Sequence, residues 1–512
     1  MAFYITTPIY YVNAEPHLGH AYTTVVADAL ARFHRLLGQE VRFQTGTDEH
    51  GEKVLEAARE AGLPVMEFVD RISALFRQTW DGLDISYDHY IRTTAPQHVR
   101  VVQEVLRQVH EAGDIYFGEY GGLYCFGCER FYLERELVDG RCPDHQVAPT
   151  LIKEENYFFR MSRYQDWLIG YIGSHPDWIR PERYKNEVLS FLKEPLEDLC
   201  LSRPRRRLDW GIPLPFDENY VTYVWFDALI NYLTGLGYPA GPDFPKFWPG
   251  AQHLIAKDIL KPHGIYWPTM LKAAGLEPFQ HLNVHGYWQM SQGKMSKSLG
   301  NVVEPRSLTA LYGTDQVRYF FLREMVFGLD ATFSEAALKS RINADLANDL
   351  GNLVARSLGM AFKYRKGLVP APGTPQALDK EVSAHAQEMA ADFLQHFPAL
   401  EFAKALAGLW EFVHLLNRYI VATAPWELAK TPEAAARLDT VLYHLLESLR
   451  LIAALLCPVM PHSALKMSDQ LGLGQKLWDQ PLPQTATWGQ LPQGTQLQKG
   501  PPLFPRLEAG EE

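Results

Sequence analysis

The sequence predicts an α/β protein in which a parallel sheet is interrupted by a long insertion and followed by an all-α region. Strand, helix and strand patterns alternate near the N-terminus and return after residue 250. Between them lies a glycine-rich segment that carries three of the five cysteines, and residues 305–465 have a helical pattern. Strand–helix–strand units build parallel sheets, in which ligands bind beyond the carboxyl ends of the strands.

Composition limits the possible class of protein. The chain has 512 residues, of which 47% are hydrophobic, enough for several cores. Its net charge of -11 argues against binding nucleic acid by general positive charge, so such contacts must come from local patches. The five cysteines are too sparse for a disulfide framework. Neither a signal peptide nor an apolar membrane-spanning run is found, so we expect a soluble cytoplasmic protein.

The first strand–helix–strand unit lies at the N-terminus. Residues 3–9 (FYITTPI) are β-branched and aromatic, which predicts a short buried strand. A helix is expected from about His20 to Leu36, where apolar residues recur at helical spacing, and Gly38 ends it. Residues 40–45 form the next expected strand.

The segment His17-Leu18-Gly19-His20 stands at the start of this helix, beyond the end of the first strand. Glycine lets a phosphate approach the backbone, a helix N-terminus supplies free N–H groups, and imidazoles can donate to phosphate oxygens. Four residues are weak evidence, and taken alone they fit a helix cap with two surface histidines somewhat better.

Residues 50–115 have a helical pattern with one possible strand at 87–92, and a cysteine-bearing segment follows. There, Cys125-x-x-Cys128 precedes Cys142-x-x-His145. Two such pairs can close a tetrahedral zinc site, which would be structural because protein fills all four positions. The alternatives are a chance cluster of cysteines and a redox pair, although a redox pair would not explain the second half of the pattern.

The densest basic run is residues 203–207 (RPRRR). It could meet RNA phosphates, but a solvated loop is the favoured interpretation. Further on, Trp225 and Tyr232 stand seven residues apart on an expected helix, so both can lie on one face. On spacing alone, core packing explains this aromatic pair better than a binding site does.

The second half of the sheet is expected from about residue 252. Residues 252–256 (QHLIA) predict a strand, with Asp258 at its carboxyl end. A helix then carries His263 and Trp267, four residues apart, and residues 281–288 predict another strand.

That last strand leads into Gly293-Lys294-Met295-Ser296-Lys297-Ser298. Alone, this segment could be a basic surface turn. Together with residues 17–20 it has the composition expected for holding the phosphates of one nucleotide.

In the helical region, residues 341–363 show one apolar stripe, and Asn352 and Arg356 lie off it, one turn apart. On spacing alone they are ordinary solvent-facing residues. Trp426 stands at an expected helix start, where a capping or core tryptophan is the simple interpretation. Residues 470–512 are rich in Gly, Pro and Gln and predict a loose wrap or linker.

HLGH and KMSKS together resemble the two ATP motifs of class I aminoacyl-tRNA synthetases. The segments TPIYYVNAEPHLGH, TGTDEHG, VWFDALINY and GKMSKS, with the cysteine-bearing insertion, resemble the methionyl-tRNA synthetase family in particular. So do the pair His263 and Trp267, the pair Asn352 and Arg356, and Ala424-Pro425-Trp426. The resemblance covers nearly the whole chain.

The resemblance implies a Rossmann-like parallel-sheet catalytic domain split by a zinc-binding connective insertion, followed by an all-α helical-bundle anticodon-binding domain. In chain order, it implies residues 1–115 for the first half of the catalytic domain, 116–222 for the insertion, 223–295 for the second half, 296–350 for the KMSKS loop and stem-contact region, 351–465 for the anticodon-binding domain, and 466–512 for a tail.

The implied reaction has two steps. The methionine carboxylate attacks the α-phosphorus of ATP, giving methionyl-adenylate and pyrophosphate, and the 3′ end of tRNA(Met) then takes the methionyl group. Mg²⁺ is expected with ATP, and one structural Zn²⁺ in the insertion.

The resemblance also assigns site residues. The catalytic residues would be His17, His20, Lys294 and Lys297. Further contacts to ATP would come from Gly19, Asp258, Val284 and Gly286. The methionine pocket would comprise Ile9, Tyr11, Asp48, Trp225, Ala228, Leu229, Tyr232, His263 and Trp267. Asn352, Arg356 and Trp426 would read the anticodon, and Cys125, Cys128, Cys142 and His145 would hold zinc.

Three features depart from the family pattern. Leu18 stands where many members have isoleucine, and His145 is a presumed zinc ligand where some relatives have cysteines or a second pair of knuckles. Many bacterial relatives also carry a C-terminal dimerising domain for which this chain has no room, so we expect a monomer.

Three rivals are weighed against this function. A class I synthetase for another amino acid, such as cysteine, would share the ATP motifs. A non-enzymatic tRNA-binding paralogue would not need to keep HLGH and KMSKS. A nucleotidyltransferase acting on a small molecule would have no use for the long helical region.

Overall fold

The computed structural model describes residues 2–126, 130–132, 134–143, 146–290 and 303–507. The chain divides into two compact units. The first comprises Met1–Pro16, Arg42–Asp81 and Tyr87–His285, and the second comprises His17–Val41, Gly82–Ser86 and Gly286–Glu512. Among the helices of the described ranges, none is long and apolar enough to cross a membrane.

The first unit is built on a seven-stranded sheet. Its paired strands, in order, are β2 (Tyr10–Tyr11), β3 (Val41–Asp48), β1 (Phe3–Thr6), β13 (Ala251–Ala256), β14 (His281–His285) and β8 (Ile179–Arg180), and β4 (His89–Arg92) pairs with β3. β1 runs parallel to β13, and β13 runs parallel to β14. The parallel sheet predicted from the sequence is therefore confirmed, with the strands after residue 250 joining those of the N-terminus.

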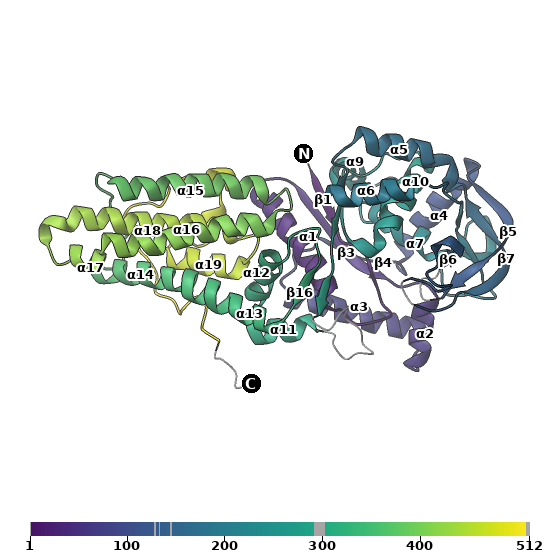
Figure 1. Cartoon of the computed structure of the whole chain (residues 1–512), viewed down its shortest axis with the longest axis horizontal. Helices are drawn as coiled ribbons and strands as arrows, with labels where there is room; N and C mark the ends of the chain where they lie inside the picture. The colour runs from purple at the N-terminus through teal and green to yellow at the C-terminus, as the bar shows by residue number, and fades with distance from the viewer. Residues whose placement is uncertain (1, 127–129, 133, 144–145, 291–302, 508–512) are drawn as a thin grey trace. The chain divides into compact units, whose positions relative to one another are not determined.

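Helices and their connections complete this unit around the sheet (Figure 1). They are α2 (Glu52–Glu60), α3 (Val65–Gly82), α4 (Pro96–Glu111), α5 (Gln165–Ser174), α6 (Glu182–Phe191), α7 (Val224–Leu229), α8 (Asn231–Thr234), α9 (Asp243–Phe247) and α10 (Trp267–Ala273). Buried side chains of the sheet, such as Tyr4, Ile255 and Leu282, share one core with those of the helices, such as Val105 and Leu271.

The insertion contains two antiparallel sheets. One is dominated by the long pair β5 (Ile115–Cys125) and β7 (Thr150–Phe159), flanked by β6 (Arg130–Tyr132) and β9 (Leu199–Cys200). The other contains β10 (Ser202–Pro204), β12 (Asp217–Thr222) and β11 (Pro213–Leu214).

The favoured interpretation of residues 203–207 as a solvated loop is wrong for Arg203. This residue lies in β10 and is only 2% exposed, whereas Arg205 and Arg206 are exposed. The Arg203 guanidinium donates to the Ser202 carbonyl oxygen at 2.7 Å, which satisfies part of its hydrogen-bonding need inside the unit.

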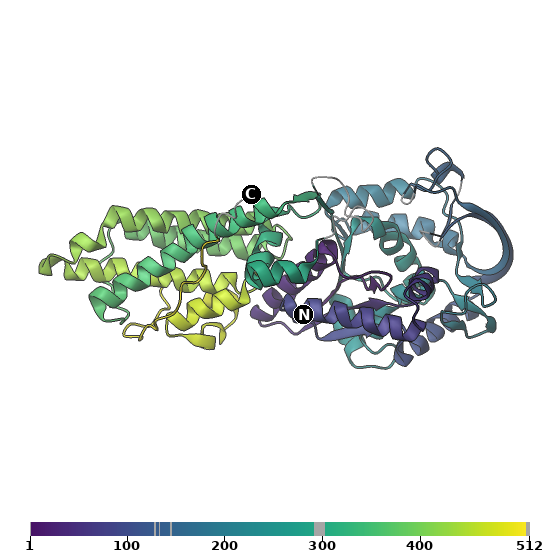
Figure 2. The same cartoon turned by 90° about the horizontal axis from the view of Figure 1, so that it is seen from below.

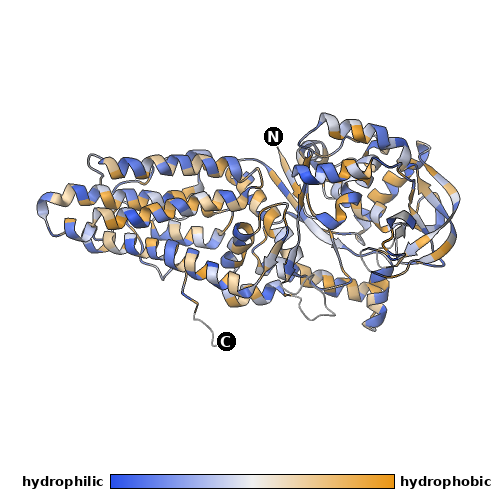
Figure 3. Cartoon of the chain, viewed as in Figure 1, coloured by the Kyte–Doolittle hydropathy of each residue, from blue (hydrophilic) through white to orange (hydrophobic). Residues whose placement is uncertain are grey.

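The second unit contains a bundle of long helices, shown side by side in Figures 1 and 2. They are α14 (Asn352–Arg365), α15 (Ala377–His396), α16 (Phe402–Thr423), α18 (Ala435–Leu456) and α19 (Pro461–Gln470). Hydrophobic and hydrophilic residues alternate along them, as expected for helices that bury one face (Figure 3). The predicted apolar stripe is confirmed, because Ile342, Leu346, Leu350, Leu353 and Val354 are all buried.

The same unit also holds α1 (Leu18–Leu36), α11 (Pro305–Tyr312), α12 (Thr314–Glu324), α13 (Glu335–Arg341), the short α17 (Pro425–Leu428) and α20 (Leu482–Thr485), and the strand pair β15 (Trp288–Met290) and β16 (Ala331–Phe333). Residues 342–351 form a π-helical stretch between α13 and α14.

Several predicted boundaries differ from the structure. The strand expected at 40–45 runs on to Asp48. The strand expected at residues 3–9 ends at Thr6, and Tyr10 and Tyr11 form a separate strand because Pro8 lacks the N–H needed to continue the ladder. The helix expected from His20 begins at Leu18. The strand expected at 281–288 ends at His285. The chain passes very close to Leu329 at the next residue, because a Cβ added to Gly286 would lie 2.3 Å from the Leu329 carbonyl oxygen.

Candidate active site

The carboxyl ends of β2 and β3 bring two predicted methionine-binding residues together. Tyr11 lies directly opposite Asp48 in the parallel register, and Asp48 is 6% exposed. Ile9 immediately precedes β2 and is half-buried. A carboxylate therefore stands at the edge of the sheet where ligands of parallel sheets bind.

Aromatic and imidazole side chains from α7, α8, α10 and the π-helical turn Pro262–Tyr266 before α10 gather in the same unit. The Tyr232 hydroxyl lies 2.7 Å from His263 Nε2, and the Trp225 and His263 rings meet edge to face at 6.3 Å. The Tyr232 and Trp267 ring centroids are 5.9 Å apart. Four residues predicted from widely separated motifs thus form one cluster, and Ala228 and Leu229 are buried on the helix that carries Trp225.

The hydrogen bonds of His263 fix its tautomer. Its Nδ1 lies 2.9 Å from the Ile259 carbonyl oxygen, which can only accept, so the proton is on Nδ1 and Nε2 accepts from Tyr232. Burial lowers the pKa of His263 to about 4, so the ring is neutral near pH 7. The cluster is therefore uncharged.

His253, on β13, joins this cluster although sequence reasoning did not select it. Its ring stacks on Tyr232 with centroids 4.0 Å apart, and its Nε2 accepts from Trp267 Nε1–H at 3.1 Å. The Thr6 hydroxyl lies 2.8 Å from the other ring nitrogen. The position of a histidine inside a predicted strand was the available signal.

The start of α1 combines a helix cap with the predicted phosphate-binding histidines. The Gly19 N–H donates to His17 Nδ1 at 3.1 Å, and the His17 N–H donates to His20 Nδ1 at 3.3 Å. The two rings stack at 3.7 Å. Burial, followed by the neighbouring His17, lowers the pKa of His20 well below its usual value, so His20 is neutral and carries its hydrogen on Nε2. The helix-cap part of that interpretation is confirmed, but both histidines are half-buried and do not lie on the surface.

The other described residues that are predicted to bind ATP lie on β14 or directly after β13 and β14. Asp258 is exposed in a short turn directly after β13, and Val284 is buried on β14 opposite Ile255. Gly286 is the first residue after β14 in the second unit. Lys294 and Lys297 lie outside the described residues.

Two of the four predicted zinc ligands are described. Cys125 and Cys142 are 1% and 0% exposed and pack in one small cluster with Tyr132. The Cys142 thiol lies 3.3 Å from the Tyr132 hydroxyl, and backbone hydrogen bonds from Gln146 and to Val147 close a turn after Cys142. Cys128 and His145 lie outside the described residues, and no group of three or more potential metal ligands occurs within the described part of the chain.

The predicted anticodon-reading residues lie in the second unit. Asn352 is exposed at the start of α14, and Arg356 follows one turn later, half-buried. Trp426 is 40% exposed on α17, so it is not a core residue. Ala424, in a left-handed conformation with φ of 42°, ends α16 and starts the turn that presents Trp426.

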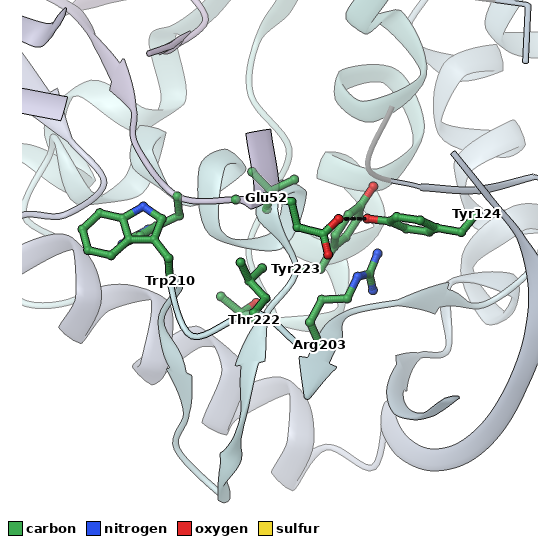
Figure 4. Close-up of a pocket in the computed structure, with 10 residues that line it drawn as sticks. Glu52, Tyr124, Arg203, Trp210, Thr222 and Tyr223 are labelled. Atoms are coloured by element: carbon green, nitrogen blue, oxygen red, sulfur yellow. Dashed lines mark hydrogen bonds between the residues drawn. The ribbon is translucent and has the colours of Figure 1, made fainter. Parts of the chain in front are cut away.

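A pocket of the first unit is shown in Figure 4. It has about 300 Å³ of empty space, part of it open to solvent, and is lined by residues 50–52, Tyr223, Val224 and residues of the insertion. Glu52 accepts from the Tyr124 hydroxyl at 3.1 Å and from Arg207 Nε at 2.9 Å. The Arg203 guanidinium lies over the Tyr124 ring at 5.2 Å.

Family models match almost the whole chain. A model described as tRNA synthetases class I (M) matches residues 3–149 and 145–358, and one described as anticodon binding domain of methionyl tRNA ligase matches residues 369–512. The chain belongs to the methionyl-tRNA synthetase family. The rival assignment to a class I synthetase for another amino acid is not supported by these matches.

Named relatives and a solved structure agree with this assignment. The chain is 48% identical to a methionine–tRNA ligase of Caldanaerobacter subterraneus, covering 100% of this chain and 80% of the relative. It is 47% identical to that of Deinococcus radiodurans, covering 99% and 74% respectively. A structure of Mycobacterium tuberculosis methionyl-tRNA synthetase in complex with methionyl-adenylate aligns with a TM-score of 0.94 at 42% identity, covering 99% of this chain and 100% of that one.

Proposed function

We infer that this chain is a methionine–tRNA ligase. It activates methionine with ATP to methionyl-adenylate, releases pyrophosphate, and transfers the methionyl group to the 3′ end of tRNA(Met). Membership of the methionyl-tRNA synthetase family supports this function. The structural observation that carries it is the neutral cluster of Trp225, Tyr232, His263 and Trp267 beside a parallel sheet.

This cluster suits the side chain of methionine. The thioether is apolar and polarizable, and aromatic faces and edges attract it. Because His263 is neutral near pH 7, it adds no charge that would have to be desolvated beside the sulfur. Asp48, opposite Tyr11 at the sheet edge, would receive the substrate ammonium. Ile9, Ala228 and Leu229 would complete the apolar wall.

Activation needs no general base, because the attacking carboxylate of methionine is already an anion. Catalysis then depends on positioning and on stabilising charge at the phosphates. His17 and His20 would donate from Nε2–H to phosphate oxygens, and Gly19 and the positive dipole end of α1 would let the nucleotide sit close.

The other assignments to ATP follow the family motifs. Lys297 would meet the leaving pyrophosphate, with Lys294 assisting. Asp258 would accept from the ribose hydroxyls, and the backbone at Val284 and Gly286 would face adenine. Mg²⁺ would accompany ATP and screen its phosphates.

The proposed zinc ligands are Cys125, Cys128, Cys142 and His145. Support comes from the two described cysteines, which are buried in one cluster although 17 positions separate them in the sequence. Thiolate and imidazole donors fit Zn²⁺, and a site filled by four protein ligands would stabilise the insertion without taking part in catalysis.

Anticodon reading would fall to the second unit. An exposed indole can stack on an unpaired base, and amide and guanidinium groups can read base edges. Trp426, Asn352 and Arg356 supply these groups.

Methionine-dependent exchange of pyrophosphate into ATP tests the assignment. We expect exchange with methionine that exceeds exchange with cysteine, isoleucine, leucine and valine by at least about 100-fold, because removing contacts from a shaped pocket costs about 1–3 kcal/mol per methylene. Faster exchange with any of the other four amino acids would overturn the assignment.

A further inference from the structure

A buried carboxylate in α7 joins two histidines of the first unit. Asp227 Oδ2 lies 2.7 Å from His50 Nδ1, and Asp227 Oδ1 lies 2.8 Å from His98 Nε2. Asp227 is 1% exposed, His98 0% and His50 7%. The far nitrogen of His98 lies 3.0 Å from the Thr234 hydroxyl in α8. None of these four residues was selected from the sequence.

The carboxylate connects segments that carry the proposed methionine contacts. His50 stands two residues after Asp48, just beyond the end of β3. In α7, Trp225, Ala228 and Leu229 are three and four residues apart and share one helix face, whereas Asp227 lies off that face. One side of α7 thus carries the proposed methionine contacts, while the opposite side is tied to His50, after β3, and to His98 of α4.

A second connection, further from Asp48, ties β3 to α8, the helix that follows α7. Gln44 of β3 donates from Nε2 to Asn231 Oδ1 at 2.7 Å and to the Asn231 carbonyl oxygen at 3.2 Å. A Cβ on Gly235 would lie 1.4 Å from Gln44 Oε1, so the chain passes very close there. Asp227 therefore bonds to the chain just after the end of β3 nearest Asp48, while Gln44 bonds from the middle of the strand.

The protonation of this group is fixed by its neighbours. Burial alone would raise the pKa of Asp227, but the charges and N–H groups of His50 and His98 outweigh it, and the pKa lies below its usual value. An ionised carboxylate only accepts, so His50 donates from Nδ1 and His98 from Nε2. An asparagine at 227 would offer one acceptor oxygen and would turn an N–H toward the other imidazole.

We propose that Asp227 is a positioning residue for methionine binding, whose carboxylate sets the spacing between the Asp48 end of β3 and the face of α7 that carries Trp225. This role rests on the proposed function, because it assumes that Asp48 and Trp225 contact methionine. Asp227 itself does not touch the substrate.

Asp227→Asn tests the proposal. A displacement of about 1 Å at a binding group can cost about 100-fold, so we expect the methionine KM in pyrophosphate exchange to rise by about 10- to 100-fold. The KM for ATP should change less than about threefold, measured on enzyme whose active sites have been titrated.

Asp114→Asn is the matched control. Asp114 is 5% exposed and accepts from Arg163 and Tyr164 at 2.5 Å each, but it lies beyond the far end of α4 from His98, about 20 Å along the helix. Both variants should lose thermal stability, and only Asp227→Asn should change the methionine KM. Equal methionine KM values in the two variants would overturn the proposal.

A second pair of variants decides the matter if Asp227→Asn does not fold. His98→Gln keeps an N–H that can donate to Asp227, whereas His98→Ala removes it, so only the alanine variant should raise the methionine KM. Identical KM values for both would contradict the positioning role. Failure of the proposed function would be visible separately, as a lack of methionine-dependent exchange in the unsubstituted chain.

Discussion

His263 illustrates how one side chain sets the chemical character of the proposed methionine pocket. Its two hydrogen bonds and its burial keep the ring neutral, and the Tyr232 hydroxyl stays engaged with Nε2 instead of with water. A protonated ring at this position would place a charge in an apolar, aromatic environment and would lose the bond from Tyr232.

The burial of His263 predicts a pH dependence of stability. Its folded pKa of about 4 lies below the unfolded value near 6.5, so as the pH falls the unfolded chain binds the proton first. Stability present above pH 6.5 is therefore lost as the pH falls to about 4, by about 3 kcal/mol at this residue. The His263→Gln variant should therefore lose less unfolding free energy between pH 7 and pH 4, as measured by urea denaturation.

The exposed His385 of α15 gives a matched control for that experiment. His385→Gln should leave the difference in unfolding free energy between pH 7 and pH 4 as it is in the unsubstituted chain. The same result for His263→Gln would mean that the ring is not held neutral by burial.

Sequence reasoning at the scale of residues found groups that stand in recognisable motifs. His263 and Trp267 are four apart, and Trp225 and Tyr232 are seven apart, so their helical faces could be worked out. His253 and Asp227 could not be found this way, because their partners lie 14 to 247 positions away in the sequence. Only folding brings such pairs together.

At the scale of elements, α1 shows what holds the proposed phosphate-binding histidines in place. Asp28, in the middle of this helix, is 0% exposed and accepts from Arg318 of α12 at 2.6 Å and from Arg32 at 2.7 Å. The backbone N–H of Ser86 donates to the same carboxylate at 2.7 Å. Its charge is compensated by two arginines, as a buried carboxylate requires.

The elements themselves were largely predictable. The periodicity of α1 and the β-branched residues of β1 and β13 predicted strands and helices near their observed positions. Boundaries failed where local chemistry intervened, as at Pro8 after β1 and at the His17 cap before α1. The buried position of Arg203 could not be inferred, because a charged side chain is expected in solvent. Its guanidinium instead lies over the rings of Tyr124 and Tyr223, a contact that the sequence does not reveal.

The zinc site proposed in the insertion can be tested by replacing one of its cysteines. Cys142→Ser should lower the zinc content from about one ion per chain to near zero and loosen the insertion, because a hydroxyl is a poor ligand for Zn²⁺. Cys457→Ser, at a half-buried cysteine outside the predicted ligand set, should keep its zinc. Elemental analysis after exhaustive dialysis is the measurement, and zinc-free unsubstituted protein would contradict the site.

At the scale of the whole molecule, methionine selection and anticodon reading are proposed to fall to different units. The methionine contacts belong to the first unit, whereas Asn352, Arg356 and Trp426 belong to the second. A net charge of -11 leaves no general attraction for tRNA, so its recognition must depend on a few shaped contacts. The family could be predicted from the sequence because the proposed methionine-binding and anticodon-reading residues lie in separate, recognisable motifs.

Comparing two activities of a single variant gives the sharpest test that the chain is a methionine–tRNA ligase. Trp426→Ala should lower kcat/KM for methionylation of tRNA(Met) by about 10- to 100-fold, since stacking on a base contributes about 1–3 kcal/mol. Methionine-dependent pyrophosphate exchange should stay within twofold of the unsubstituted chain. Val421→Ala, at a 63% exposed residue on the last turn of α16, is the control and should change neither activity. Equal losses of both activities in Trp426→Ala, or methionylation that is unaffected, would contradict the account.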